Sequence, residues 1–245
     1  MKFVTVACVM AVLCDWPTAE AGSVYCNDFE GVVGAEWSEQ STSVTTSGRR
    51  FLGVFGAQTV SLAIATVPAG TVNLAFDLFV INTWDGNQFT DPLSTPTHVV
   101  GPDVWELSLA SGTTLFHATF SVFDGTKAMH SFRDFPQSYP DDYPEGTNPA
   151  RTGASENDTL GYFEGDSVYR LAFSFAHAGG PLDFNFSGLF PQGDPEEWGV
   201  DNILVSAVPE PSSFVVGSIV GLMGIAYLNL CRPEGRRADY LKPHG

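Results

Sequence analysis

The stretch of sequence that decides the fold is residues 167–187, which read SVYRLAFSFAHAGGPLDFNFS. In its first half, large apolar side chains alternate with charged or small ones: Tyr169, Leu171, Phe173 and Phe175 against Arg170, Ala172 and Ser174. The second half alternates in the same way: Leu182, Phe184 and Phe186 against Asp183, Asn185 and Ser187. Because successive side chains of a β-strand point to opposite faces, this period of two predicts two strands, each with one buried face.

Short apolar runs of the same kind recur on both sides of this stretch. They are rich in Val, Phe, Ile, Leu and Thr and are broken by Gly, Pro, Asp and Asn, as strands and turns are. The predicted strands are Val24–Phe29, Phe51–Phe55, Thr59–Ala65, Thr71–Asn82, Val104–Ala110, Thr114–Phe123, Ser167–Ala178, Leu182–Ser187 and Gly199–Ala207. Strands without helices between them predict an all-β fold, an antiparallel β-sandwich, and within that class we favour a jelly roll.

The N-terminus has the three parts of a secretory signal peptide. Lys2 gives a basic start, residues 3–13 form an apolar core, and Ala19 and Ala21 are the small residues at the −3 and −1 positions. The apolar core is shorter than the roughly 20 residues that span a bilayer. We therefore expect a signal peptide over residues 1–21, cleaved after Ala21, and a mature domain over residues 22–207.

The C-terminal tail, residues 208–245, contains a candidate transmembrane helix over residues 214–230. Its length is at the lower limit for a spanning helix. A proline-rich triplet stands before it: Pro209, Glu210 and Pro211. A basic cluster follows it, which would place that side in the cytoplasm by the positive-inside rule: Arg232, Arg236 and Arg237.

The tail resembles a PEP-CTERM sorting signal, because the triplet, the helix and the arginine cluster follow one another in that order. The resemblance implies that an exosortase-like membrane transpeptidase recognises the tail. It also implies that the protein reaches the cell surface or the extracellular matrix, where it would contact extracellular polysaccharide. Residues 238–245 extend beyond the usual basic end of such signals. The alternative is an ordinary membrane anchor behind a proline-bearing linker, and both interpretations put the middle of the chain outside the cytoplasm.

Charge and cysteine content restrict the class of partner. The 245-residue chain has 11 Lys and Arg against 28 Asp and Glu, a net charge of −17. Such a surface repels phosphate backbones, which argues against nucleic acid. Of the four cysteines, only Cys26 falls in the mature domain, so we expect no internal disulfide and a buried, inert thiol rather than one that couples two chains.

Catalytic motifs are absent from the sequence. It contains no nucleophile elbow, zinc-binding His-Glu-x-x-His, phosphate loop or dinucleotide fingerprint. The histidines of the mature domain are scattered singly: His98, His117, His130 and His177. Glycoside hydrolysis needs only two suitably spaced carboxylates, so a polysaccharide-acting hydrolase stays open as the least favoured reading. We expect no enzyme.

A structural calcium ion is implied by a second resemblance. Residues 27–31 (NDFEG) and 198–203 (WGVDNI) resemble the ends of galactose-binding-like jelly rolls, which include carbohydrate-binding modules. In that family an acidic residue near the first strand and an Asp in the last strand share a calcium. The resemblance implies Glu30 and Asp201 as ligands, with Asp28 beside them; the alternative is that all three are turn or edge residues.

Aromatic residues beside carboxylates mark two candidate ligand-binding segments. Trp84 and Asp85 come directly after a predicted strand, where the tryptophan would stack on a sugar ring or, alternatively, cap the core. The second segment is the long polar stretch 124–158, which carries Phe135, Tyr139 and Tyr143. Tyrosines with acidic neighbours suit saccharide hydroxyls or a protein partner, and the alternative is a loop packed over the sandwich.

The sequence therefore predicts a non-catalytic protein of the cell surface or extracellular matrix that binds polysaccharide. A structural envelope or matrix protein without glycan binding is the alternative.

Overall fold

The computed structural model describes residues 21–91, 98–123, 135–189 and 196–209. These residues belong to one compact unit, Glu20–Pro209. The signal peptide, the candidate transmembrane helix and Glu210, Pro211, Arg232, Arg236 and Arg237 lie outside the described residues. Within those described ranges, no helix has the length and apolar character needed to cross a membrane.

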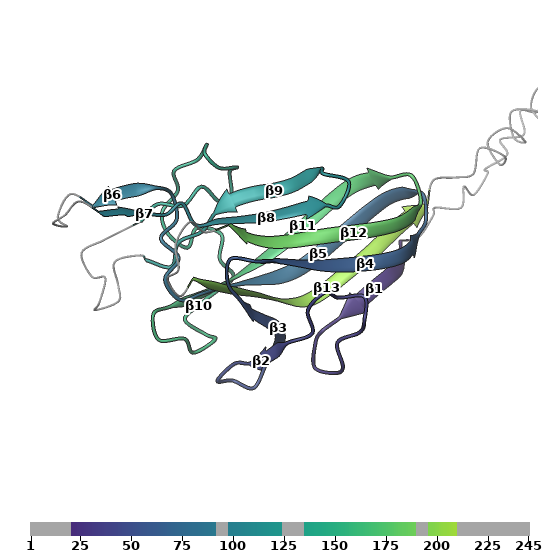
Figure 1. The fold of residues 1–245 in the computed structure, drawn as a ribbon, viewed down its shortest axis with the longest axis horizontal. Helices are drawn as coiled ribbons and strands as arrows, with labels where there is room; N and C mark the ends of the chain where they lie inside the picture. The colour runs from purple at the N-terminus through teal and green to yellow at the C-terminus, as the bar shows by residue number, and fades with distance from the viewer. Residues whose placement is uncertain (1–20, 92–97, 124–134, 190–195, 210–245) are drawn as a thin grey trace, which may run out of the picture. The chain divides into compact units, whose positions relative to one another are not determined.

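The described unit is built of β-strands (Figure 1). They are β1 (Gly22–Asn27), β2 (Thr42–Val44), β3 (Arg50–Phe55), β4 (Thr59–Val67), β5 (Gly70–Ile81), β6 (Phe89–Asp91), β7 (His98–Val100), β8 (Val104–Leu109), β9 (Thr114–Thr119), β10 (Glu156–Asn157), β11 (Asp166–His177), β12 (Gly180–Leu189) and β13 (Glu197–Pro209). Each of the nine predicted segments overlaps one of the longer strands, which confirms the all-β class. The sequence missed β2, β6, β7 and β10, because two or three residues are too few to show a period of two.

Two antiparallel sheets form the two layers of a sandwich (Figure 1). The seven-stranded sheet has the order β10-β11-β5-β13-β3-β2, and β1 pairs with the same edge of β13 beyond β3. The four-stranded sheet has the order β4-β12-β8-β9. Because Gly22 of β1 pairs with Ala207 of β13, the two ends of the unit lie side by side.

The core fills the space between the sheets with aromatic side chains. The alternation predicted for residues 167–187 is confirmed at most positions: Tyr169, Leu171, Leu182, Phe184 and Phe186 are buried, and Arg170, Ala172 and Ser174 are exposed. Phe173 and Phe175 are half-buried, and Ser187, predicted on the open face, is buried. Trp105 of the small sheet meets Trp198 of the large sheet with ring centroids 6.0 Å apart. Each fully buried side chain of this size stabilises the fold by about 1.5–3 kcal/mol.

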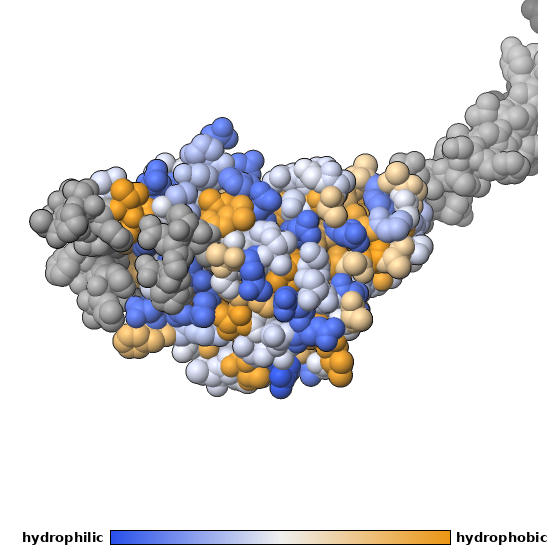
Figure 2. Space-filling model, in the orientation of Figure 1, coloured by the Kyte–Doolittle hydropathy of each residue, from blue (hydrophilic) through white to orange (hydrophobic). Residues whose placement is uncertain are grey.

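The surface itself is mixed. Figure 2 shows hydrophobic residues scattered among polar ones on the face in view, without one continuous apolar band. The most exposed large apolar side chains in the described ranges are Val32, at 92%, and Phe163, at 79%. Single exposed apolar residues of this kind are normal for a folded domain.

Candidate functional site

The loop that contains the predicted ligand-binding tyrosines is fixed by one buried side chain, Gln137. Its Oε1 accepts hydrogen bonds from the backbone of Ser121 (3.1 Å) and Arg151 (3.0 Å) and from the Tyr169 hydroxyl (3.1 Å). Its Nε2 donates to the carbonyls of Tyr139 (3.2 Å) and Thr152 (3.0 Å). A buried amide with all its partners satisfied holds the surrounding backbone in one arrangement. The part of the loop that contains Tyr139 and Tyr143 is therefore an ordered layer at the β9 edge.

Tyr143 lies on this loop beside β9. Its backbone N–H donates to the His117 carbonyl at 2.9 Å, and the Nδ1 of His117 lies 3.2 Å from the Tyr143 carbonyl oxygen. The two rings have centroids 6.1 Å apart. Both side chains are half-buried, so part of each ring system remains open to solvent.

A surface pocket of about 360 Å³ opens at this point. Its lining residues come from β9 and from the loop: Thr114, Leu115, Phe116, His117, Asp142, Tyr143 and Glu145. Asp142 and Glu145 are exposed and accept hydrogen bonds, while Tyr143 adds an aromatic surface with a hydroxyl. The pocket thus combines a partly open aromatic ring with two carboxylates and an imidazole.

Two of the other predicted ligand-binding residues, Trp84 and Phe135, are buried, which corrects the interpretation that they meet a sugar; Tyr139 is half-buried, and its contact with a ligand stays a prediction. Trp84 is completely buried and donates its indole N–H to the Glu197 carbonyl at 2.8 Å. Phe135 is 3% exposed. Tyr139 packs its ring on Phe120 and Tyr169, with centroids 5.2 Å from each. The alternation of aromatic and polar residues in the loop could not reveal which rings turn inward.

Asp85, the remaining predicted ligand-binding residue, belongs to a cluster of carboxylates. The ligand atoms of Asp85, Asp103 and Glu196 all lie within 4.8 Å of one another, close enough to share a metal ion. The backbone N–H of Asp85 donates to Oδ2 of Asp103. Burial, with the neighbouring charges of Asp85 and Glu196, raises the pKa of Asp103 to about 8.

Sequence reasoning missed Asp103 and Glu196 in this cluster. The turn signal at Asp85 and Gly86 was visible, but Asp103 follows eighteen residues later and Glu196 more than ninety later, with no spacing that links them. Only the fold brings the three carboxylates together.

The predicted calcium ligands are near one another but do not form such a cluster. Oδ1 of the exposed Asp28 accepts the backbone N–H of Glu30 at 3.2 Å, and Oε1 of Glu30 accepts the backbone N–H of Arg50 at 2.9 Å. Asp201 is 2% exposed, and its Oδ2 lies 3.7 Å from Nε of Arg49. Among the described residues, Asp28, Glu30 and Asp201 are not a group with ligand atoms within 4.8 Å. In this arrangement they do not fit a shared ion, and calcium at this position stays a prediction.

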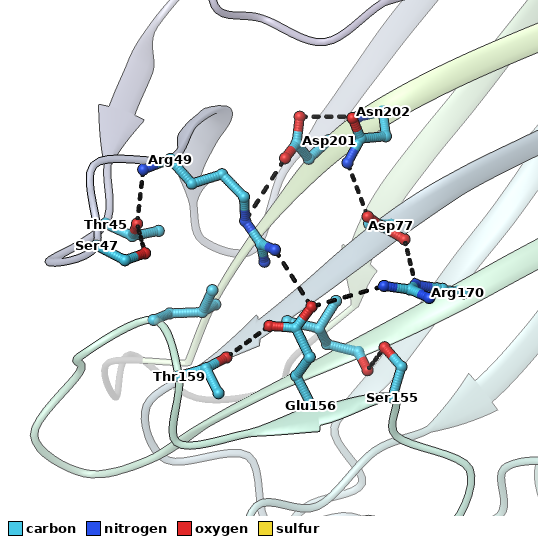
Figure 3. A network of polar contacts seen from close by, with 12 residues as sticks. Thr45, Ser47, Arg49, Asp77, Ser155, Glu156, Thr159, Arg170, Asp201 and Asn202 are labelled. Atoms are coloured by element: carbon cyan, nitrogen blue, oxygen red, sulfur yellow. Dashed lines mark hydrogen bonds and ion pairs between the residues drawn. The ribbon is translucent and has the colours of Figure 1, made fainter.

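A ring of polar contacts surrounds Asp201 instead (Figure 3). Arg49 bridges Asp201 and Glu156, the latter at 3.3 Å, and its guanidinium stands 4.5 Å from the centroid of the Phe79 ring. Arg170 links Glu156 (3.9 Å) to Asp77 (3.7 Å). Asn202 closes the ring, since its side chain donates to Asp77 and its backbone N–H donates to Asp201, both at 2.8 Å.

This ring sets the ionisation of Asp201. Burial raises the pKa of its carboxyl to about 6, against the opposing effects of the Asn202 N–H and the Arg49 charge; the charges of Asp77 and Glu30 add to the increase. The side chains join β5, β10, β11, β13 and the turn before β3, so the ring ties together strands of the large sheet that are distant in sequence.

No known family model matches this chain, and a search of curated proteins found no significant match.

Proposed function

We propose that the chain is an exported, non-catalytic protein of the cell surface or extracellular matrix, and that its β-sandwich binds polysaccharide. The pocket beside β9 is the observation that supports this proposal. Tyr143 lines this pocket together with three polar residues within reach of one ligand: Asp142, Glu145 and His117. An aromatic ring packs against the apolar C–H face of a sugar, and carboxylates accept hydrogen bonds from its hydroxyls. The pocket lies at the surface, where one stretch of a long polymer can reach it.

The fold proposed for this role is a jelly roll. Leaving aside the short strands and β1, the large sheet has the order β3-β13-β5-β11 and the small sheet β4-β12-β8-β9. The chain crosses repeatedly from one sheet to the other, as in a double Greek key of eight strands. This arrangement supports the proposed likeness to carbohydrate-binding jelly rolls.

The proposal includes the export and sorting of the protein. An exosortase-like transpeptidase would recognise Pro209, Glu210 and Pro211 together with the apolar run and the basic cluster of Arg232, Arg236 and Arg237. Pro209 is the last residue of β13, so the triplet follows directly on the folded unit. The alternative is an ordinary membrane anchor, which would hold the same exported domain at the membrane without transfer of the chain to another molecule.

A glycan screen tests the binding function. The unit Glu20–Pro209 contains its own core, and it should bind one class of saccharide. Tyr143→Ala should weaken that binding about tenfold, the equivalent of about 1.4 kcal/mol. The matched control is Phe163→Ala, which removes another exposed aromatic ring outside the pocket and should leave the affinity unchanged.

Two outcomes would overturn the proposal. Absence of binding to any saccharide would favour a structural envelope or matrix protein. Hydrolysis of a polysaccharide that one carboxylate substitution abolishes would make the protein a hydrolase.

A further inference from the structure

The outer edge of β11 directs its backbone groups away from the sheet. In the β10 segment, the backbone N–H groups of Ser155 and Asp158 donate to the carbonyls of Val168 (2.7 Å) and Asp166 (3.0 Å). These carbonyls therefore point away from β5, which pairs with the opposite side of β11 along its whole length. Since backbone groups alternate along a strand, every second residue from there on points the same way: Arg170, Ala172, Ser174 and Ala176.

These residues are open to solvent. Ala172, Ser174 and Ala176 are exposed, and the Arg170 side chain is 71% exposed. The strand pair with β10 covers only Ser167 and Val168. Between Arg170 and His177, β11 thus has no strand partner on this side among the residues that the structure describes.

Other strand edges of this unit are covered by its own backbone. Along β4, Ser38 donates its N–H to the Ser61 carbonyl at 2.9 Å. Along β9, the N–H groups of Tyr139 and Tyr143 donate to the carbonyls of Thr119 and His117. Natural proteins protect sheet edges in this way, or with charges, prolines and bulges, because an open edge pairs with another strand.

Beyond Arg170, the β11 edge has none of these protections in its sequence. Residues 171–177 read LAFSFAH and contain no acidic residue, no lysine and no proline. The register of β11 with β5 is also continuous, without a bulge. In a chain with a net charge of −17, this segment is one where two copies can approach without carboxylates facing each other.

We propose that β11 pairs antiparallel with β11 of a second copy of this chain, so that two seven-stranded sheets join into one. An antiparallel pair is self-complementary, because each outward residue offers both an N–H and a carbonyl to its opposite number. With the overlap centred on the open segment, Phe173 lies opposite the same residue of the second copy. The half-buried rings of Phe173 and Phe175 lose solvent contact in that arrangement.

The test is the mass of the purified full chain in detergent, which prevents its apolar C-terminal run from driving association. Wild-type protein should sediment as a dimer, and Ala172→Pro should halve the mass. The proline removes an N–H that points away from β5, so the ladder to β5 survives. Thr71→Lys is the control, because it charges an exposed position on β5, which is paired on both sides, and it should leave the dimer intact.

Hydrogen exchange gives a second measurement that does not depend on a variant. The backbone amides of Ala172, Ser174 and Ala176 should become protected as wild-type protein is concentrated, and the same three amides should exchange freely on dilution. A monomer at every soluble concentration would overturn the proposal. So would a dimer that Ala172→Pro leaves unchanged, or one that Thr71→Lys dissociates, since the latter would place the interface on the sheet face.

Discussion

The guanidinium of Arg49 lies against the buried carboxylate of Asp201, with Nε 3.7 Å from Oδ2. The sequence led us to expect a calcium ion beside Asp201, and in the structure the nearby positive charge is that of a side chain. The same guanidinium contacts Glu156 and the face of Phe79. One residue in a turn before β3 therefore balances charge on two other strands.

Replacing Arg49 should destabilise the fold in a pH-dependent way. Arg49→Met leaves the buried Asp201 charge without its guanidinium, and we expect a loss of about 2 kcal/mol at pH 7. The pKa of Asp201 is already raised to about 6, so its charged form is the costly one, and removal of Arg49 raises that pKa further. At pH 4 the Asp201 carboxyl is protonated with or without Arg49, so the part of the loss that comes from Asp201 should disappear, while the part that comes from the ion pair with Glu156 remains.

Urea unfolding at both pH values measures this effect. Arg50→Met is the matched control, because the Arg50 side chain bonds the Thr42 hydroxyl and takes no part in the ring. An equal loss for Arg49→Met at pH 4 and pH 7 would show that Arg49 does not stabilise the fold through the charge of Asp201.

Asp103 should make the protein less stable as pH rises. Its pKa is about 8 in the folded protein and about 3.9 in an unfolded chain. Between these values the folded state binds the extra proton, so the free energy of unfolding falls with increasing pH, by at most about 1.4 kcal/mol per pH unit. Asp103→Asn mimics the protonated form. The free energy of unfolding of this variant should therefore increase relative to that of wild type between pH 4 and pH 8.

The comparison is made in chelator, so that no cation replaces the proton. The control is Asp142→Asn, which replaces an exposed carboxylate of the pocket. Its free energy of unfolding should change with pH in parallel with that of wild type. Parallel profiles for Asp103→Asn and wild type would mean that Asp103 is ionised throughout this range.

Calcium is tested by melting with and without chelator. We expect the chelator to lower the midpoint, because an ion that binds only the folded state stabilises it. Two variants then locate the ion: Asp201→Asn removes the position that the sequence implied, and Asp103→Asn removes the cluster with Asp85 and Glu196. The variant that abolishes the chelator effect identifies the ligand. If the chelator leaves the wild-type midpoint unchanged and the protein contains no bound metal, the prediction of a structural calcium ion is wrong.

Cys26 should react in the folded state. We expected a buried thiol, but Cys26 is exposed on β1 and forms no disulfide. A maleimide should therefore label it without denaturant, and peptide mass spectrometry would locate the label. Labelling that requires urea would contradict the exposure seen here. Cys26→Ser is the control for reaction at Cys231.

The strands were predictable because their signal is local. The alternation over residues 167–187 is visible within each strand, and β11 and β12 follow it closely. The segment 124–158 was less predictable. From residue 135 onward it is held by Gln137, whose partners Ser121 and Tyr169 are sixteen and thirty-two residues away. No pattern in the loop itself indicates that anchor.

The candidate sites were less visible still, because their members are distant in sequence. Arg49, Glu156 and Asp201 meet only after β3, β10 and β13 have taken their places in one sheet. A tryptophan such as Trp84 can stack on a sugar ring, yet the strand that precedes Trp84 directs its ring into the core. Of the predicted aromatic residues, Tyr143 lines a surface pocket.

Export is the claim on which the surface function rests, and the N-terminus of the mature protein tests it most directly. Cells are fractionated, and the chain is identified in each fraction by intact mass and N-terminal peptide analysis. The account predicts a protein of the envelope or medium that begins at Gly22. A full-length chain that begins at Met1 and stays in the cytosol would contradict it.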